Sequence, residues 1–125
     1  MFTTYKTSEA LTMDGNIYLL QYGSYISKDV MEENIKKLDN YIILEEDDKF
    51  YVYVGAFINL DNAYKMQKKL QDNNIYTYIK NDYLDSNIIE KIKNVENKIL
   101  ENDKDIFKVN SEIINILKKI GGDNY

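Results

Sequence analysis

Hydrophobic and polar residues alternate in several short segments of the chain, which is the pattern of β-strands that bury one face. Four such segments, rich in β-branched and aromatic residues, cover residues 17–25, 41–45, 50–57 and 75–80. The turn signal Asp14-Gly15-Asn16 precedes the first of them. Residues 1–16 are polar and show no period, so we interpret them as a flexible tail or linker.

Two segments between these strands carry apolar residues at helical spacing. The first covers residues 29–39 after a cap signal at Ser27, and the second covers residues 61–73 after Asn59. The predicted order of elements is therefore βαββαβ.

This order contains an internal repeat. A shift of 32 residues brings Gly23 onto Gly55 and Asp29 onto Asp61, so two βα units in the same register follow each other. Two such halves interleave into a four-stranded antiparallel sheet with both helices on one face. The sequence thus predicts an α+β fold of the ferredoxin-like type. The repeated glycines are expected where the chain leaves the sheet too close to a helix for a Cβ atom.

Three segments of the repeat resemble one known family. Ile17–Tyr25 is similar to the opening strand of the SPOR (sporulation-related repeat) domain, in which an aromatic residue precedes Val-Gln-Val-Gly-Ser-Phe. Tyr51–Phe57 is similar to the second signature of the family, and the second predicted helix resembles the helix of the family that is rich in Glu-Asn-Ala. The likeness covers residues 17–80. Ala56 stands where the family usually has Pro, and Tyr53 where it often has Arg.

The resemblance implies binding rather than catalysis. SPOR domains bind peptidoglycan, favour glycan strands stripped of their stem peptides, and gather at division or sporulation septa. They sit outside the membrane on anchored or secreted proteins. The resemblance therefore implies an extracytoplasmic location on the cell-wall side, with a membrane anchor or export signal that this chain does not contain.

Strand alternation sorts the side chains of the sheet into two faces. The more apolar set, which includes Leu20 and Val52, should meet the helices. The outward set is Leu19, Gln21, Tyr51, Tyr53, Tyr76, Tyr78 and Lys80. We expect this face to be open, with four tyrosines and Gln21 and no charge at its centre. A neutral polysaccharide suits such a face, because sugar C–H groups stack on aromatic rings while Gln and Tyr tips bond hydroxyl and acetamido groups.

The resemblance adds to this set. Gln21, which lies just before Gly23-Ser24, occupies a position that belongs to the glycan-contacting residues of the family. Ser24 lies at the strand end, where it contacts the ligand or serves as a turn residue. The predicted glycan-binding residues are Leu19, Gln21, Ser24, Tyr51, Tyr53, Tyr76 and Tyr78. The alternative is that the tyrosines pair across the strands and only stabilise the sheet.

Composition narrows the function further. The 125 residues carry a net charge of −5 and contain neither His nor Cys, which removes thiol catalysis, thiolate metal sites and the commonest general base. The four carboxylates of residues 45–48 fall in a predicted turn, where water solvates them and no apolar pocket raises a pKa for catalysis. We therefore expect a protein that is not an enzyme and that holds no metal and no cofactor. RNA-recognition domains share the βαββαβ order, but their third strand carries a basic flank. The third strand of this chain has no such flank and the chain is acidic overall, so nucleic acid is not an expected partner. No apolar run is long enough to span a membrane. The abundance of Lys, Ile and Asn suggests an AT-rich, Gram-positive source.

The C-terminal segment, residues 86–120, carries a separate signal. Apolar residues recur there in steps of four and three, as in a heptad seam, with Asn102 at one of the seam positions. The segment is either one long helix, which must self-associate to bury its stripe, or a helical hairpin that turns near Asn102-Asp103. We lean slightly towards self-association into a homo-oligomer. An alternative function is accordingly a protein-interaction or oligomerisation module of a cell-envelope or sporulation complex.

Overall fold

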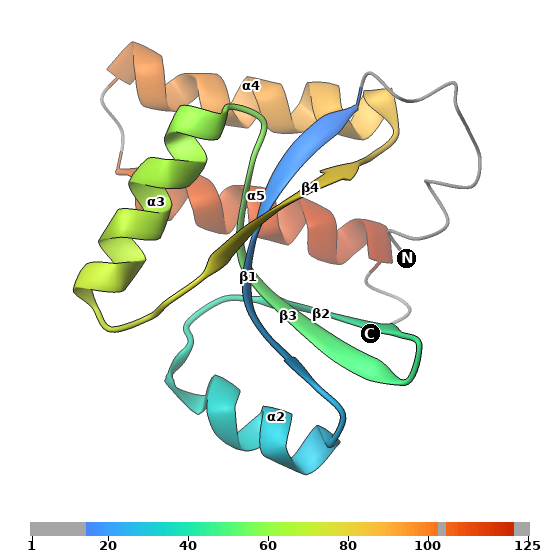
Figure 1. Cartoon of the computed structure of the whole chain (residues 1–125). Helices are drawn as coiled ribbons and strands as arrows, with labels where there is room; N and C mark the ends of the chain where they lie inside the picture. The colour runs from blue at the N-terminus through green and yellow to red at the C-terminus, as the bar shows by residue number, and fades with distance from the viewer. Residues whose placement is uncertain (1–14, 103–104, 122–125) are drawn as a thin grey trace.

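The computed structural model of the chain describes residues 15–102 and 105–121. Its elements are β1 (Asn16–Tyr25), α2 (Lys28–Asn34), the 3₁₀ turn η2 (Ile35–Lys37), β2 (Ile42–Glu46), β3 (Lys49–Phe57), α3 (Leu60–Asp72), β4 (Tyr78–Tyr83), α4 (Ser86–Asn102) and α5 (Ile106–Gly121) (Figure 1). The predicted tail falls almost entirely outside the described residues.

The four strands form one antiparallel sheet in the order β2-β3-β1-β4. This is the ferredoxin-like arrangement that the repeat predicted. Met31 of α2 and Ile35 of η2 pack against Val52 of the sheet, and α3 packs against β1 and β3. The βαββαβ order is therefore confirmed, with both helices of the repeat on one face.

The fourth strand was predicted too early. It begins at Tyr78 instead of Ile75, because the chain first turns back on the end of α3. The backbone N–H groups of Asn73 and Ile75 both bond to the carbonyl of Leu70, and Asn74 adopts a left-handed φ of 63°. Residues 75–77 are thus used for the turn and the approach to the sheet.

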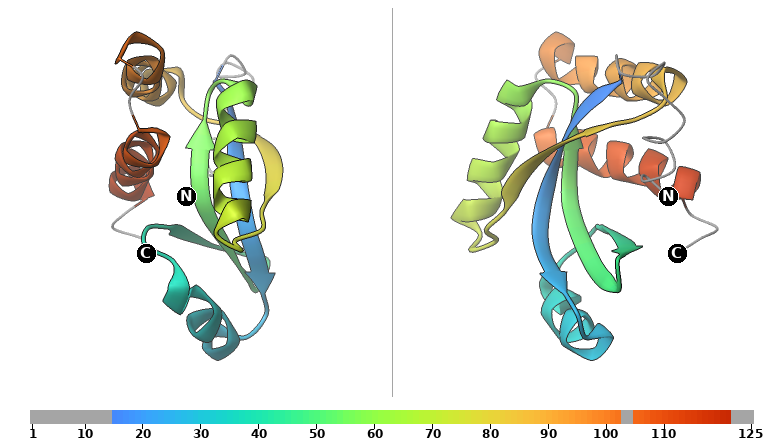
Figure 2. Two further views of the ribbon diagram at one scale, coloured as in Figure 1. Left: turned by 90° about the vertical axis from the view of Figure 1, so that its left-hand side faces the viewer. Right: turned by 45° about the vertical axis from the view of Figure 1, so that its right-hand side comes forward.

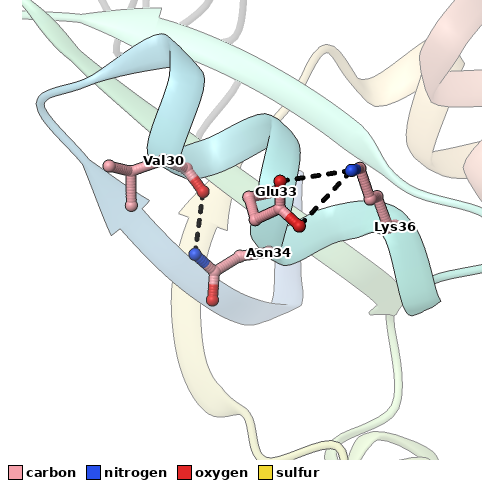
Figure 3. A network of polar contacts seen from close by, with 4 residues as sticks. All are labelled: Val30, Glu33, Asn34 and Lys36. Carbon is pink, nitrogen blue, oxygen red and sulfur yellow. Dashed lines mark hydrogen bonds and ion pairs between the residues drawn. The ribbon is translucent and has the colours of Figure 1, made fainter.

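Both helices of the repeat begin at the predicted caps. The Ser27 hydroxyl accepts a hydrogen bond from the Val30 N–H at 3.2 Å, and the Asn59 side chain accepts from the Asp61 N–H at 2.8 Å. Helix α2 is shorter than predicted, because the Asn34 side chain bonds back to the Val30 carbonyl at 2.8 Å and the chain continues as η2 (Figure 3). The Glu33–Lys36 pair in the same view is exposed and contributes little.

The C-terminal segment is a hairpin of two helices. Helix α4 ends at Asn102, and the Asp105 side chain accepts a hydrogen bond from the Phe107 N–H at 2.9 Å at the start of α5. The helices contact each other, and Lys98 and Glu112 form an ion pair of 3.7 Å between them. The prediction of one continuous helix is therefore wrong, and the hairpin alternative is confirmed. The preference for self-association depended on that continuous helix. Much of the apolar stripe lies inside this chain: Ile92, Ile106, Val109 and Ile113 are all buried.

Helix α5 lies against the edge of the sheet where β2 is missing. The pairing of β2 with β3 ends at Ile42 and Tyr53, so the last residues of β3 have no strand on that side. The side chain of Asn110 in α5 replaces the missing strand as the hydrogen-bond partner of β3. The Asn110 Nδ2 donates to the Val54 carbonyl at 2.8 Å, and the Asn110 Oδ1 accepts from the Ala56 N–H at 3.2 Å. The left view of Figure 2 shows α5 nearly end-on beside β3, with β4 at the other edge.

Gly55 lies in the same place and has no room for a side chain. A Cβ atom there would lie 2.6 Å from Leu20 Cδ1 and 3.0 Å from Asn110 Oδ1. The glycine is thus required by a close approach, as predicted, but the neighbours are a cross-strand leucine and the C-terminal helix instead of the helix that follows.

A second polar contact joins the hairpin to the repeat. The carboxylate of Glu96 in α4 accepts hydrogen bonds from the Ile58 N–H at 2.6 Å, the Asn59 N–H at 2.9 Å and the Asn62 side chain at 2.8 Å. Burial raises the pKa of this carboxyl, although the three hydrogen bonds act in the opposite direction. None of the helices in residues 15–102 and 105–121 is long and apolar enough to cross a membrane.

Candidate functional site

The register brings most of the predicted binding residues into adjacent rows of the sheet. Gln21 of β1 lies opposite Tyr53 of β3 on one side and Tyr78 of β4 on the other. Ser24 lies opposite Tyr51 in the next row. Below, the tyrosine face denotes the sheet face that carries Leu19, Gln21, Ser24, Tyr51, Tyr53, Tyr78 and Lys80.

The pairing of β1 with β3 is irregular on both sides of Gln21. The register shifts between Leu20 and Gln21 and again between Gln21 and Gly23. Such bulges increase the local twist and re-aim side chains. They allow Gln21 and Ser24 to share a face although three positions separate them.

The tyrosine face is only partly open, which corrects the prediction of a fully open sheet. Tyr78 is 67% exposed and Ser24 is exposed, whereas Gln21 and Tyr51 are half-buried. Leu19 and Tyr53 are 0% and 2% exposed and cannot reach a ligand. They belong to one hydrophobic cluster with apolar residues of α4 and α5, among them Ile92, Ile113 and Leu117.

Tyr76 lies outside this set. It precedes β4, so strand alternation does not place it on the tyrosine face as the sequence predicted. Its side chain is 63% exposed and lies two residues before Tyr78 at the entrance to the edge strand.

Lys80 is the residue that the prediction undervalued. Its ammonium donates a hydrogen bond to the Tyr53 hydroxyl at 3.3 Å and lies 5.3 Å from the ring centroid of Tyr51 and 5.9 Å from that of Tyr53. These distances are typical of cation–π contacts. The expectation of an uncharged centre is therefore wrong, because the lysine stem reaches across β1 and carries its charge over the tyrosines.

The Tyr53 hydroxyl stays protonated in this setting. Burial raises the pKa of Tyr53 strongly, and the negative charges of Asp82 and Glu46 raise it further. The neutral phenol accepts from Lys80, so it fixes the position of the ammonium. Tyr53 is thus a buried residue that holds the Lys80 ammonium in place.

The acidic run at residues 45–48, predicted to lie in a turn, only partly does so: Glu45 and Glu46 belong to β2, and Asp47 and Asp48 form the turn to β3. Glu46 pairs with Lys49, and both Asp47 and Asp48 have positive φ, of 54° and 63°, as in a two-residue hairpin turn. The described part of the chain contains no cluster of acidic residues that could hold a metal ion.

The contacts of three residues, Lys80, Asn110 and Glu96, escaped the sequence analysis. Alternation placed Lys80 on the correct face, but its reach to β3 has no signal in the sequence. Asn110 and Glu96 interrupt the apolar stripes of α5 and α4, and a polar residue on an otherwise apolar helix face is the signal that would have indicated a buried partner.

Comparisons with known proteins give one distant likeness. No protein-family model matches the chain. No curated protein matches its sequence. Among solved structures, it is similar to the solution structure of the peptidoglycan binding domain of the B. subtilis cell wall lytic enzyme CwlC, with 21% identity and a TM-score of 0.46. The match covers 54% of this chain and 90% of that domain.

Proposed function

We propose that the chain is a non-catalytic module that binds the glycan strands of peptidoglycan and thereby directs its parent protein to the cell wall, at division or sporulation sites. In this proposal residues 17–80 form the binding unit and residues 86–120 brace it. The observation that carries the proposal is the accessible row of Gln21 and Tyr78, with Ser24 and Tyr51 beside it on adjacent strands.

This arrangement suits a saccharide for physical reasons. The exposed ring of Tyr78 and the half-buried ring of Tyr51 offer flat apolar surfaces to sugar C–H groups. Gln21 and Ser24 lie between them and provide donors and acceptors for hydroxyl and acetamido groups. The motifs around Gly23 and Gly55 that resemble the SPOR family point to the same ligand. The absence of His and Cys from the sequence favours a binding role over a catalytic one.

The test is co-sedimentation with purified sacculi, with and without amidase treatment to remove stem peptides. Wild-type protein should sediment with the sacculi, and the Tyr78→Ala and Gln21→Ala variants should each lose about 1–3 kcal/mol of binding free energy, as truncated binding contacts do. The matched control is Tyr64→Ala, because Tyr64 is also exposed (54%) but lies on α3.

Failure has a defined meaning. If wild-type protein stays in the supernatant with both kinds of sacculi, the tyrosine face is not a glycan site. The protein-interaction module then becomes the better account of the chain.

A further inference from the structure

Strand β4 forms the outer edge of the sheet beside β1 (Figure 2). The two strands pair in one unbroken antiparallel register, which the hydrogen bond from the Leu84 N–H to the Gly15 carbonyl (2.7 Å) extends. Since hydrogen-bonded pairs alternate in such a ladder, the N–H and C=O groups of Ile79 and Asn81 point away from β1. No hydrogen bond among residues 15–102 and 105–121 reaches these outward groups.

The two ends of this edge already have partners within the chain. Before the strand, the Gln67 side chain of α3 donates to the Thr77 carbonyl at 3.0 Å. At the end of the strand, the Asp82 carboxylate accepts from the Tyr83 N–H at 2.8 Å. The backbone groups that a new strand can reach lie between these two contacts, so the edge fits a short partner strand.

Exposed tyrosines gather along the same edge. Tyr76, Tyr78 and Tyr83 are 63%, 67% and 38% exposed, and lie on β4 or just before it. Aromatic side chains are enriched on surfaces through which proteins associate. A lysine on an edge strand commonly keeps other strands away, but the ammonium of Lys80 points inwards to the Tyr53 hydroxyl. The edge of β4 is therefore both aromatic and unguarded.

The opposite edge of the sheet, β2, is less suited to pairing with a second copy. It carries Glu45 and Glu46 at its end, and Glu45 is exposed. Like charges that face each other across two strands are destabilising. The free part of β4, residues 78–81, contains Lys80 as its single charged residue. The edge of β4 can therefore meet a copy of itself with little repulsion.

We propose that two copies of the chain pair through β4, antiparallel about a two-fold axis at Ile79. In this register the two Ile79 residues exchange backbone hydrogen bonds. The Asn81 N–H of each copy donates to the Thr77 carbonyl of the other, which has a second lone pair beside the one that Gln67 uses. Tyr78 of each copy lies beside the aliphatic stem of Lys80 in the other.

Two alternative registers are less favourable. An axis at Lys80 places the two lysines directly opposite each other. An axis at Asn81 needs the Tyr83 N–H as a donor to Ile79 of the other copy, but this N–H already bonds to Asp82. The axis at Ile79 meets neither obstacle.

The pairing joins the two sheets into one sheet of eight strands, with both tyrosine faces on the same side. It goes beyond the proposed function and does not depend on it, because no ligand takes part in the contact. The interface lies on β4 and is separate from residues 86–120, for which the sequence predicted self-association.

The experiment measures the mass in solution by sedimentation equilibrium, over a concentration series that extends to about 1 mM, because small interfaces are weak. The mass of the wild-type protein should rise from that of a monomer towards that of a dimer. Asn81→Pro removes one outward N–H and spares the pairing with β1, because proline is tolerated where the N–H of an edge strand faces solvent. This variant should dimerise about tenfold more weakly or worse, as expected for a lost hydrogen bond.

Asn81→Ala is the matched control. It changes the same exposed side chain but keeps the N–H, so it should dimerise as wild type. Circular dichroism checks that Asn81→Pro is folded. If it is not, Tyr78→Lys makes the same test, because it places a second lysine beside Lys80 of the other copy and keeps every backbone group.

Hydrogen exchange followed by NMR locates the interface. Exchange of the Ile79 and Asn81 N–H groups should slow as the protein concentration rises, while exchange along β2 should not change. A wild-type protein that stays monomeric at the highest concentration overturns the proposal, and leaves the edge to an extended peptide of another protein. A folded Asn81→Pro variant that dimerises as wild type, or protection confined to α4 and α5, overturns it as well.

Discussion

Replacing Asn110 with alanine should remove the contact that closes the free edge of β3. The Asn110 amide is 4% exposed and serves two backbone groups, the Val54 carbonyl at 2.8 Å and the Ala56 N–H at 3.2 Å. Both groups would stay buried without a partner, and each such loss costs about 1–3 kcal/mol. Allowing for partial relaxation, we expect the free energy of unfolding to fall by about 2–4 kcal/mol, a large share of the roughly 5–15 kcal/mol of an ordinary domain.

The measurement is urea unfolding followed by circular dichroism, with linear extrapolation to water. Asn115→Ala is the matched control, because Asn115 is exposed on the same helix and the gain in helix propensity is the same. Asn110→Asp provides a second probe: it keeps an acceptor for the Ala56 N–H but directs a negative oxygen at the Val54 carbonyl, so it should be no more stable than the alanine variant. An Asn110→Ala protein within about 0.5 kcal/mol of the Asn115→Ala control, the usual range of surface substitutions, would refute this account of the edge.

Two other predictions follow from buried groups. Tyr53→Ala should lower the free energy of unfolding by about 3–5 kcal/mol, as for other large aromatic residues truncated in a core. Tyr53→Phe is the control, because it loses only the hydroxyl that accepts from Lys80. A Tyr53→Ala variant as stable as wild type in thermal unfolding would contradict the buried position. Since burial raises the folded-state pKa of Glu96, wild type should gain stability relative to Glu96→Gln as the pH falls from neutral towards the ordinary value of 4.5, and should lose that gain as the pH rises through the raised pKa. A difference in unfolding free energy between the two proteins that does not change with pH would show that the carboxyl is not perturbed.

Most of the repeat could be predicted from the sequence because its signals are local. The cap at Ser27 and the alternation along β1 and β3 depend on neighbouring residues only. The start of β4 was missed because it depends on hydrogen bonds to Leu70 at the end of α3, which hydrophobic alternation does not report.

Such local signals do not show that the α4–α5 hairpin covers part of the tyrosine face. The apolar stripe of residues 86–120 keeps its phase across the break between α4 and α5, so the period does not distinguish one helix from two. The sequence also does not indicate which surface the hairpin covers. The position of the hairpin determines that Tyr53 is buried while Tyr78 stays exposed. The residues predicted on β1 and β3 thus do lie in adjacent rows, but Leu19 and Tyr53 are buried where the sequence predicted an open face.

The shared cluster of sheet and hairpin has a consequence for how the chain acquires its structure during synthesis. Ile42, Leu44 and Tyr53 complete their packing with Ile113 and Leu117, which are translated much later. Contacts between such distant parts of a chain slow folding, because a long loop must close before they form. A nascent chain that has not yet emerged beyond α4 would carry β2 and β3 with their apolar side chains unpaired and the outer edge of β3 free, a surface prone to association with other chains. We therefore expect the sheet to become stable only when α5 has emerged from the ribosome, and not when the repeat is complete.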